Sequence, residues 1–295
     1  MLLEVPAEDF SLQASLSSGQ TFRWTQHDGW YYGFVGPSVL KVRQDGDRLV
    51  YESSDVVLTP DRVIRYFGLD VNFPEILSSI DVDMQIHHAI LQHRGLRILR
   101  QEGWETLASF ICASFNNIKR IEGMIERLCQ AYGEPVALNG FRSFNFPRPE
   151  LIAGTSERRL RSLGLGYRAP YLKATAQLVA EGKLPIDHLR RVDYRSTKAA
   201  LLACEGVGDK VADCVALFGF EKYEAFPIDV WIERAMRYYF RHRTMTRKRL
   251  HDYAHRHFGP YAGYAQQYLY HYVRNLRSAT SDHVREDVTS GREAA

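Results

Sequence analysis

The sequence predicts an α+β fold, in which an N-terminal antiparallel β-sheet domain precedes an all-helical bundle. Apolar and polar side chains alternate through residues 21–53, as they do in strands with one buried and one solvated face. From Pro60 onward the apolar residues recur at spacings of three and four, which is the period of amphipathic helices. The 295 residues are 45% hydrophobic and 25% charged, so the chain can bury a substantial core.

The alternating N-terminal stretch is divided by three turn signals. These are His27-Asp28-Gly29, Gly36-Pro37-Ser38 and Asp45-Gly46-Asp47. Turns this close together join neighbouring antiparallel strands, and we therefore expect a β-rich domain over residues 1–82.

The remainder of the chain is predicted to be helical. We expect one or more helical domains over residues 83–278. The tail, residues 279–295, lacks apolar anchors and is expected to be disordered. The helical patterns cover residues 61–69, 85–94, 104–115, 118–133, 169–182, 197–204, 209–220, 230–240, 248–258 and 261–276.

Cysteine usage and the N-terminus point to an intracellular protein. The four cysteines show no CxxC pairing and lie in apolar helical contexts, so we interpret them as reduced thiols. No cysteine cluster follows Cys214, which argues against an iron–sulfur centre. No apolar run has the length of a membrane span, and the N-terminus lacks the basic region of a secretory signal. The net charge of +3 permits a polyanionic partner without requiring one.

The stretch from Leu201 to Asp229 carries the clearest chemical signal. Two short helical patterns flank Gly206-Val207-Gly208. A glycine turn at the start of a helix lets backbone N–H groups approach a phosphate closely, because no Cβ blocks them. We interpret these three residues as a phosphate-binding turn.

Lys210 and Asp229 are the candidate catalytic residues. Lys210 falls in the first turn of a helix, where the helix dipole disfavours an ammonium, and burial would lower its pKa further. A neutral amine can attack an electrophilic carbon and form a Schiff base; binding a phosphate by charge alone is the other interpretation. Asp229 follows a proline at the start of a helical pattern, so it either only caps a helix or also acts in catalysis.

Together with four other blocks, this stretch resembles the 8-oxoguanine DNA glycosylase family of the helix-hairpin-helix-GPD superfamily. The blocks occur in the family's order and span roughly residues 10–275. The resemblance implies that the helical part is a helix-hairpin-helix-GPD glycosylase bundle. The other four are an SGQ-x-FRW strand, an asparagine-run helix start, an LGLGYRA turn and a GPYAG-aromatic-AQ helix: residues 18–24, 116–121, 163–169 and 259–266.

The resemblance also implies the reaction. Lys210 would attack the sugar C1′ of a damaged nucleotide, displace the base and leave an imine, from which β-elimination nicks the strand. Asp229 would stabilise the positive charge that develops on the sugar and would move protons. The nucleotide must first leave the duplex, because C1′ and the base edge are inaccessible in the stack.

Residue roles in DNA binding follow from the same resemblance. Tyr167 would wedge into the vacated stack, while Arg120 and Arg168 would donate to the cytosine left without its partner. Asn116, in the asparagine run, is assigned to DNA binding as well. The hairpin residues Gly206, Val207 and Gly208 would bind the phosphate 3′ to the lesion through backbone N–H groups.

Recognition of the damaged base is assigned to four residues. The carbonyl of Gly19 would accept the hydrogen that 8-oxoguanine carries at N7, where normal guanine presents an acceptor. Gln266 would read the Watson–Crick edge. Cys214 and Tyr270 would lie on the two faces of the ring.

The sequence departs from the family pattern at three positions. Glu205 replaces a proline in the hairpin, and Trp231 replaces a histidine two residues after the catalytic aspartate. Phe115 replaces the first asparagine of the run, which in the family touches the opposite cytosine. A phenylalanine can stack but cannot form that hydrogen bond, so we expect looser discrimination of the opposite base.

We therefore predict a monomeric DNA glycosylase and AP lyase that excises 8-oxoguanine opposite cytosine from double-stranded DNA. It is expected to need no metal and no small-molecule cofactor, to have no membrane association, and to act inside the cell on DNA. Two alternatives stay open: an alkylated-purine glycosylase of the 3-methyladenine type, which activates water with Asp229 alone, and a non-catalytic helix-hairpin-helix DNA-binding module. Lys210 argues against both.

Overall fold

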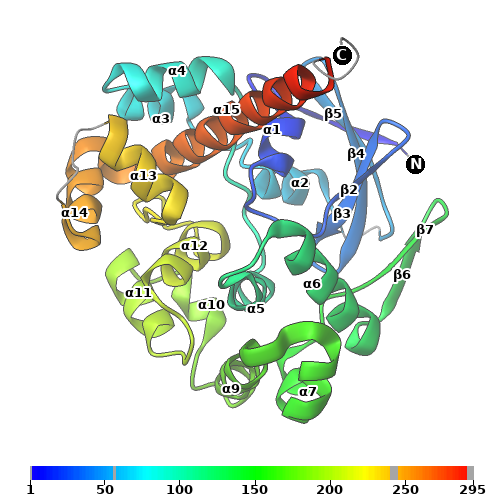
Figure 1. The fold of residues 1–295 in the computed structure, drawn as a ribbon. Helices are drawn as coiled ribbons and strands as arrows, with labels where there is room; N and C mark the ends of the chain where they lie inside the picture. Colours follow the sequence, from blue (N-terminus) through cyan, green and yellow to red (C-terminus); the bar gives the residue numbers. More distant parts are fainter. Residues whose placement is uncertain (1, 56–57, 240–244, 291–295) are drawn as a thin grey trace.

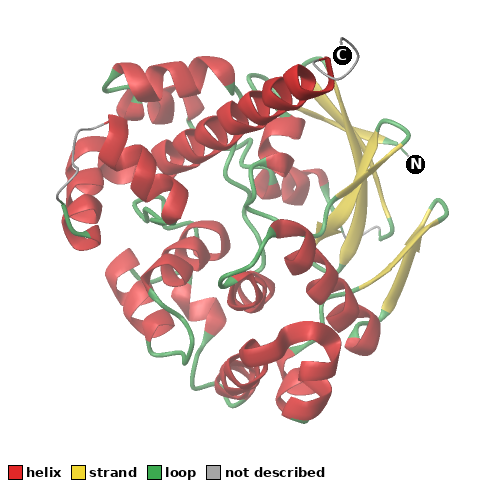
Figure 2. Cartoon of the chain, viewed as in Figure 1, coloured by secondary structure: helices red, strands yellow, loops and turns green. Residues whose placement is uncertain are grey.

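The structure is a computed structural model that describes residues 2–55, 58–239 and 245–290. It confirms the predicted fold class. A five-stranded antiparallel sheet lies on one side of the molecule, and helices form most of the rest (Figures 1 and 2).

The five-stranded sheet has the order β1-β5-β4-β3-β2, and all neighbouring strands are antiparallel. All three predicted turns connect consecutive strands, and only the first strand was not predicted. Side chains alternate between the two faces of each strand, so every second one points into the core. Val42, for example, lies opposite Tyr51, and both are fully buried. The strands are β1 (Leu3–Pro6), β2 (Thr25–His27), β3 (Trp30–Val35), β4 (Ser38–Asp45) and β5 (Arg48–Ser53).

The inner face of the sheet packs against α1 (Leu12–Ser17) and α2 (Pro60–Tyr66). Ser11 caps α1, since its side chain accepts a hydrogen bond from the Ala14 amide at 3.2 Å. Pro60 is the first residue of α2, where its lack of an N–H removes no hydrogen bond within the helix.

A larger core unites the remaining helices. It includes Phe73, Ile76 and Ile80 of α3, so this helix packs with the helical part although it precedes residue 83. The division at residues 82 and 83 stays a prediction. The helices are α3 (Phe73–Ile80), α4 (Met84–Gln92), α5 (Gly103–Ala113), α6 (Ile118–Tyr132), α7 (Pro149–Ala153), α8 (Glu157–Leu160), α9 (Ala169–Ala180), α10 (Ile186–Leu189), α11 (Tyr194–Leu202), α12 (Asp209–Phe220), α13 (Val230–Tyr239), α14 (Arg247–Phe258) and α15 (Ala262–Ser290). Three short helical turns, η1 (Arg161–Leu165), η2 (Gly166–Arg168) and η3 (Gly259–Tyr261), connect them.

A two-stranded hairpin interrupts the helices and was not predicted. Strands β6 (Pro135–Leu138) and β7 (Phe141–Phe144) are joined by Asn139-Gly140, both with positive φ. Asn-Gly is the strongest short sequence signal for such a turn. Each strand has only four residues, which is too short for a clear alternation.

Helix α15 is the long diagonal helix of Figure 1 and packs against α4 and α13. It continues through residues 279–290, a segment that we expected to be disordered. Helix propagation is favourable once a helix has formed, and no glycine or proline occurs between Gly263 and Gly291 to stop it. Residues 291–295 of the expected tail lie outside the described residues.

Candidate active site and DNA-binding surface

The glycine turn joins α11 to α12 as predicted, because one residue takes a conformation that favours glycine. Gly206 has φ +79°, and a Cβ there would lie 2.5 Å from the ring of Tyr171. Gly208 directly precedes α12, whose first N–H groups have no partner within the helix. The amide of Val207, however, donates to the Cys204 carbonyl at 3.1 Å. In this structure the amides of Gly206 and Gly208 are therefore the hairpin donors that remain for a phosphate.

A small pocket lies beside the start of α12 and has a volume of about 50 Å³. It brings together six residues from distant parts of the chain to which catalysis or base recognition was assigned. The pocket is lined by Ser18, Gly19, Phe110, Lys210, Cys214, Phe218, Pro227, Asp229, Gln266, Gln267 and Tyr270.

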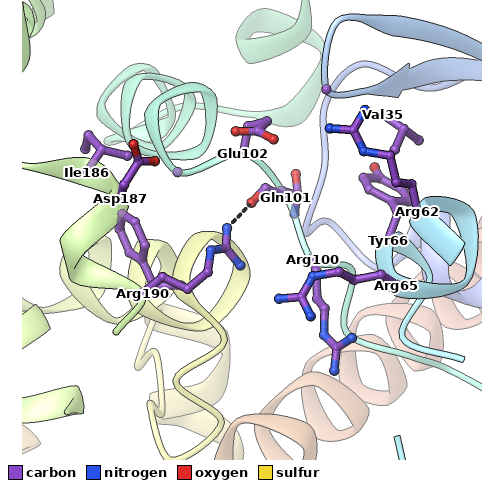
Figure 3. Close-up of a pocket in the computed structure, with 13 residues that line it drawn as sticks. Val35, Arg62, Arg65, Tyr66, Arg100, Gln101, Glu102, Ile186, Asp187 and Arg190 are labelled. Atoms are coloured by element: carbon purple, nitrogen blue, oxygen red, sulfur yellow. Dashed lines mark hydrogen bonds between the residues drawn. The ribbon is translucent and has the colours of Figure 1, made fainter. Parts of the chain in front are cut away.

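A larger cavity of about 300 Å³ lies elsewhere, between α2 on one side and α10 with the start of α5 on the other (Figure 3). Arginines and carboxylates line it, and the arginines Arg65, Arg100 and Arg190 are paired with Glu221. None of the predicted site residues lines this cavity. The smaller pocket, which holds an amine and a carboxylate together, is therefore the candidate active site.

Lys210 is a charged amine in this pocket. Burial, the largest single influence, lowers its pKa, but Cys214, Asp229 and Tyr270 raise it by more, so that the pKa lies above its ordinary value. The expectation of a lowered pKa is therefore wrong, because helix position and burial were weighed without these neighbours. Burial raises the pKa of the Cys214 thiol to about 11, so the thiol is neutral at pH 7. The carboxylate of Asp229 is then the negative group that attracts the ammonium.

Asp229 caps α13, as its position after a proline predicted. Its Oδ1 atom accepts hydrogen bonds from the amides of Trp231 and Ile232 at 2.9 and 2.8 Å. The Oδ2 atom has no hydrogen-bond partner among the described residues. One oxygen thus holds the carboxylate in place, while the other is available to the pocket.

Gln266 presents an unused acceptor. Its side chain is 5% exposed, and Oε1 is buried with no hydrogen-bond partner within the described part of the chain. An unpaired buried amide oxygen is costly unless a ligand supplies a donor. Gln266, Cys214 and Tyr270 line the pocket, whose wall therefore has both polar and apolar groups. Burial raises the pKa of the Tyr270 phenol.

The Gly19 loop is fixed by two glutamines. Gln20, fully buried, donates to the carbonyls of Ser15 and Arg97 and accepts from the Leu99 amide. Gln267 donates to the Ser18 carbonyl at 2.8 Å and ties α15 to the same loop. Sequence reasoning did not single out Gln267, although an amide next to Gln266 on one helix was a visible signal.

The residues assigned to the vacated stack and to the cytosine left without its partner form a second group, around the turn between α5 and α6. Arg168 is buried and donates to the carbonyls of Ser114 and Phe115, and its guanidinium lies 4.4 Å from the centre of the Tyr167 ring. The Tyr167 hydroxyl donates to the Ser114 carbonyl at 3.1 Å. Arg168 therefore braces the turn before α6 in the free protein instead of extending toward solvent.

That turn ends in an unusual phenylalanine. Phe115 is 100% exposed and has φ +50°, a backbone conformation that side-chain-bearing residues rarely adopt. Asn117 caps α6, because its side chain accepts a hydrogen bond from the Arg120 amide at 3.0 Å. Arg120 is exposed and lies in the first turn of α6, beside the turn that carries Phe115. Asn116 Oδ1 accepts from the Asn117 amide.

The comparisons with known proteins match both parts of the chain. Residues 2–107 match the N-terminal domain of 8-oxoguanine DNA glycosylase, and residues 108–258 match the HhH-GPD superfamily of base excision DNA repair proteins. The chain belongs to the 8-oxoguanine DNA glycosylase family. This glycosylase is 30% identical to a probable N-glycosylase/DNA lyase of Methanothermobacter thermautotrophicus, with 96% of this chain and 99% of that protein covered.

Two further relatives agree with this assignment. The glycosylase is 33% identical to the N-glycosylase/DNA lyase of Saccharomyces cerevisiae, over 79% of this chain and 69% of that protein. Its fold matches the 8-oxoguanine glycosylase/lyase of Clostridium acetobutylicum, solved with double-stranded DNA containing cytosine opposite 8-oxoguanine. That match has 29% identity and a TM-score of 0.87, over 94% of this chain and 98% of the other.

Two features are absent from the described residues of this glycosylase: a membrane-spanning helix and a cluster of metal ligands. None of its helices combines the length and apolar character that a membrane span requires. No cluster of three or more histidine, cysteine or acidic side chains is arranged to hold a metal ion in the described ranges.

Proposed function

We propose that this protein is a bifunctional DNA glycosylase and AP lyase of base excision repair, which removes 8-oxoguanine opposite cytosine with Lys210 as nucleophile. The observation that carries the proposal is the pocket in which Lys210, Asp229 and the unpaired oxygen of Gln266 converge. Family membership supplies the class of reaction and of lesion. We expect the enzyme to act on DNA inside the cell and as a monomer.

In the proposed reaction Lys210 first loses a proton, because an ammonium has no lone pair to donate. Asp229 lines the same pocket, and its free Oδ2 atom is the proposed acceptor for protons during the reaction. The amine then bonds to C1′ while the bond from C1′ to the base breaks, and the departing base takes up a proton. Opening of the sugar gives the imine, and loss of a C2′ proton expels the 3′ phosphate. Hydrolysis of the imine restores Lys210.

Recognition of the base uses the opposite wall of the pocket. The Gly19 carbonyl is proposed to accept the N7 hydrogen of the lesion, and Gln266 to meet its Watson–Crick edge. The loop is tied down by buried glutamines, and a preorganised acceptor discriminates between a donor and a second acceptor by about 1–3 kcal/mol. Cys214 and Tyr270 are proposed to enclose the ring.

The second group of residues is proposed to hold the duplex open. Tyr167 and Phe115 present aromatic surface beside Arg120 and Asn116, and the hairpin amides of Gly206 and Gly208 bind a backbone phosphate. Aromatic surface can replace the stacking of an extruded base. Phe115 offers no hydrogen bond, so the opposite base is read less strictly.

Borohydride trapping tests the central step. Wild-type protein incubated with an 8-oxoguanine duplex and borohydride should give a covalent adduct, and Lys210→Gln should give none while it still binds the duplex. Lys183→Gln is the matched control, because Lys183 is exposed and distant from Lys210 in the sequence. This variant should trap like wild type. Base release that leaves the strand intact, without an adduct, would instead support the monofunctional alkylpurine type.

A further inference from the structure

A buried ion pair ties together the two helices that flank the hairpin. Asp213 on α12 has a side chain that is 2% exposed, and Lys198 on α11 one that is 15% exposed. Lys198 Nζ lies 2.9 Å from Asp213 Oδ1 and 3.0 Å from Oδ2. The pair therefore bridges α11 and α12, and each of its residues lies about one helical turn from the end of the helix that adjoins the hairpin.

The same carboxylate accepts a hydrogen bond from a second side chain and lies close to a third. The Tyr194 hydroxyl on α11 donates to Asp213 Oδ1 at 2.6 Å, and His251 Nε2 on α14 lies 3.3 Å from Oδ2. Three helices thus meet at one buried charge. None of these contacts belongs to the pocket, because Asp213 is absent from its lining.

A buried ion pair differs from apolar packing in one respect. Apolar side chains tolerate small rotations of two helices, whereas any rotation that separates a buried pair leaves an uncompensated charge, which is strongly destabilising. The angle between α11 and α12 decides where the Gly206 and Gly208 amides point. A change in this angle would separate the pair, so the ion pair opposes such a change.

We propose that Asp213, through its ion pair with Lys198, is a positioning residue that aims the hairpin amides at the DNA phosphate. The inference rests on the proposed function, since the hairpin is taken to bind DNA. Asp213 touches neither the phosphate nor the reacting sugar. Its effect is on DNA affinity and not on the chemistry of bound substrate.

The test compares binding with chemistry in four variants. Lys198→Met and Asp213→Asn remove one charge each, Tyr194→Phe removes a single hydrogen bond, and Lys198→Arg keeps the charge. The probe is a duplex that carries an uncleavable tetrahydrofuran abasic site, with affinity measured by fluorescence anisotropy. Single-turnover excision of 8-oxoguanine is measured separately at saturating enzyme.

We expect Lys198→Met and Asp213→Asn to raise the Kd about tenfold, which matches the loss of one hydrogen bond to a charged group. Excision at saturation should stay within about threefold of wild type, because the pocket is unaltered. Lys198→Arg should retain most of the affinity. Tyr194→Phe should raise the Kd by a smaller factor, and it keeps the test open if the charge variants do not fold.

Glu221→Gln is the matched control for a general loss of stability. Glu221 directly follows the other end of α12 and forms its own ion pairs there. This variant should melt at a lower temperature and yet keep the wild-type Kd. If its Kd rises as much as that of Lys198→Met, or if folded Lys198→Met and Asp213→Asn bind like wild type, the inference is overturned. A wild-type protein that binds the abasic duplex but excises nothing would contradict the proposed function alone.

Discussion

The Nζ atom of Lys210 lies 5.3 Å from the centre of the Phe110 ring. The face of an aromatic ring attracts a cation, and Asp229 on the same pocket also favours the charged amine. Both groups therefore favour the protonated form of the Lys210 amine in the free protein.

This protonation state predicts the pH dependence of trapping. Because the pKa of Lys210 lies above 10.5, the neutral fraction grows with pH throughout the neutral range. The single-turnover rate of adduct formation, measured with borohydride at saturating enzyme, should increase from about pH 7 to about pH 9. Asp229→Asn, which removes the attracting carboxylate, should be slower and should shift the rise to lower pH. A rate that is flat or falls over this range would contradict the assignment.

Glu221 should be important for stability although it is far from the pocket. It sits at φ +59° after α12, accepts a hydrogen bond from Arg65 at 2.7 Å, and forms ion pairs with Arg100, whose Nε lies 3.0 Å away, and with Arg190. Glu221→Gln removes the charge that pairs with the buried Arg100 and with the more exposed Arg65 and Arg190, and it should lower the free energy of unfolding by about 1–3 kcal/mol.

The measurement for Glu221→Gln is urea denaturation. Asp187→Asn is the comparison, because this exposed carboxylate lines the cavity that the three arginines also line, and it has no ion pair among the described residues. It should change the free energy of unfolding by no more than about 0.5 kcal/mol. Equal effects of the two variants would show that the Glu221 ion pairs contribute nothing specific.

Phe115 should decide how strictly the opposite base is read. Phe115→Asn relieves the strain at φ +50°, since asparagine adopts left-handed backbone more readily, and it adds a donor and an acceptor. We expect the ratio of excision rates opposite cytosine and opposite adenine to increase by roughly tenfold. Phe115→Leu keeps an apolar side chain and should leave the ratio near that of wild type. The experiment compares single-turnover rates on duplexes that differ only in the opposite base; an unchanged ratio in Phe115→Asn excludes the role.

Acid should destabilise the protein through a buried histidine pair. His271 lies with its ring centre 4.3 Å from that of His93, and burial, with His93 next, lowers the pKa of His271 to about 4. In the unfolded chain the pKa returns to about 6.5. As pH falls from about 6.5 to about 4, the unfolded chain takes up the proton first, so stability is lost in this window and is fully present above it.

Melting temperatures measured between pH 7 and pH 4.5 check this prediction. His271→Gln should reduce the fall in melting temperature relative to wild type, because one proton-linked group has been removed. His27→Gln, in the exposed strand β2, should leave the fall unchanged. The histidine pair has no such role if wild type and His271→Gln lose stability in parallel.

The pattern of the sequence was sufficient for the fold class and for the chemically important segments. Period-two alternation with closely spaced turns predicted the sheet, and the glycine turn between helices predicted the hairpin. Pro227 before Asp229 predicted the cap of α13. All of these depend on residues within a few positions of each other, so local rules apply. The strands β6 and β7 were missed, although Asn139-Gly140 signalled their turn.

Only the tertiary structure decided how the pocket works. Gly19 and Gln266 lie at opposite ends of the sequence, and they share a cavity because Gln20 and Gln267 hold the intervening segments together. The sequence by itself placed Lys210 at a helix start and predicted a lowered pKa, but the electric field at a buried amine depends on which groups fold around it. Cys214, one helical turn along α12, acts together with Asp229 and Tyr270, which the fold brings to the same pocket, and these neighbours raise the pKa of Lys210 above its ordinary value.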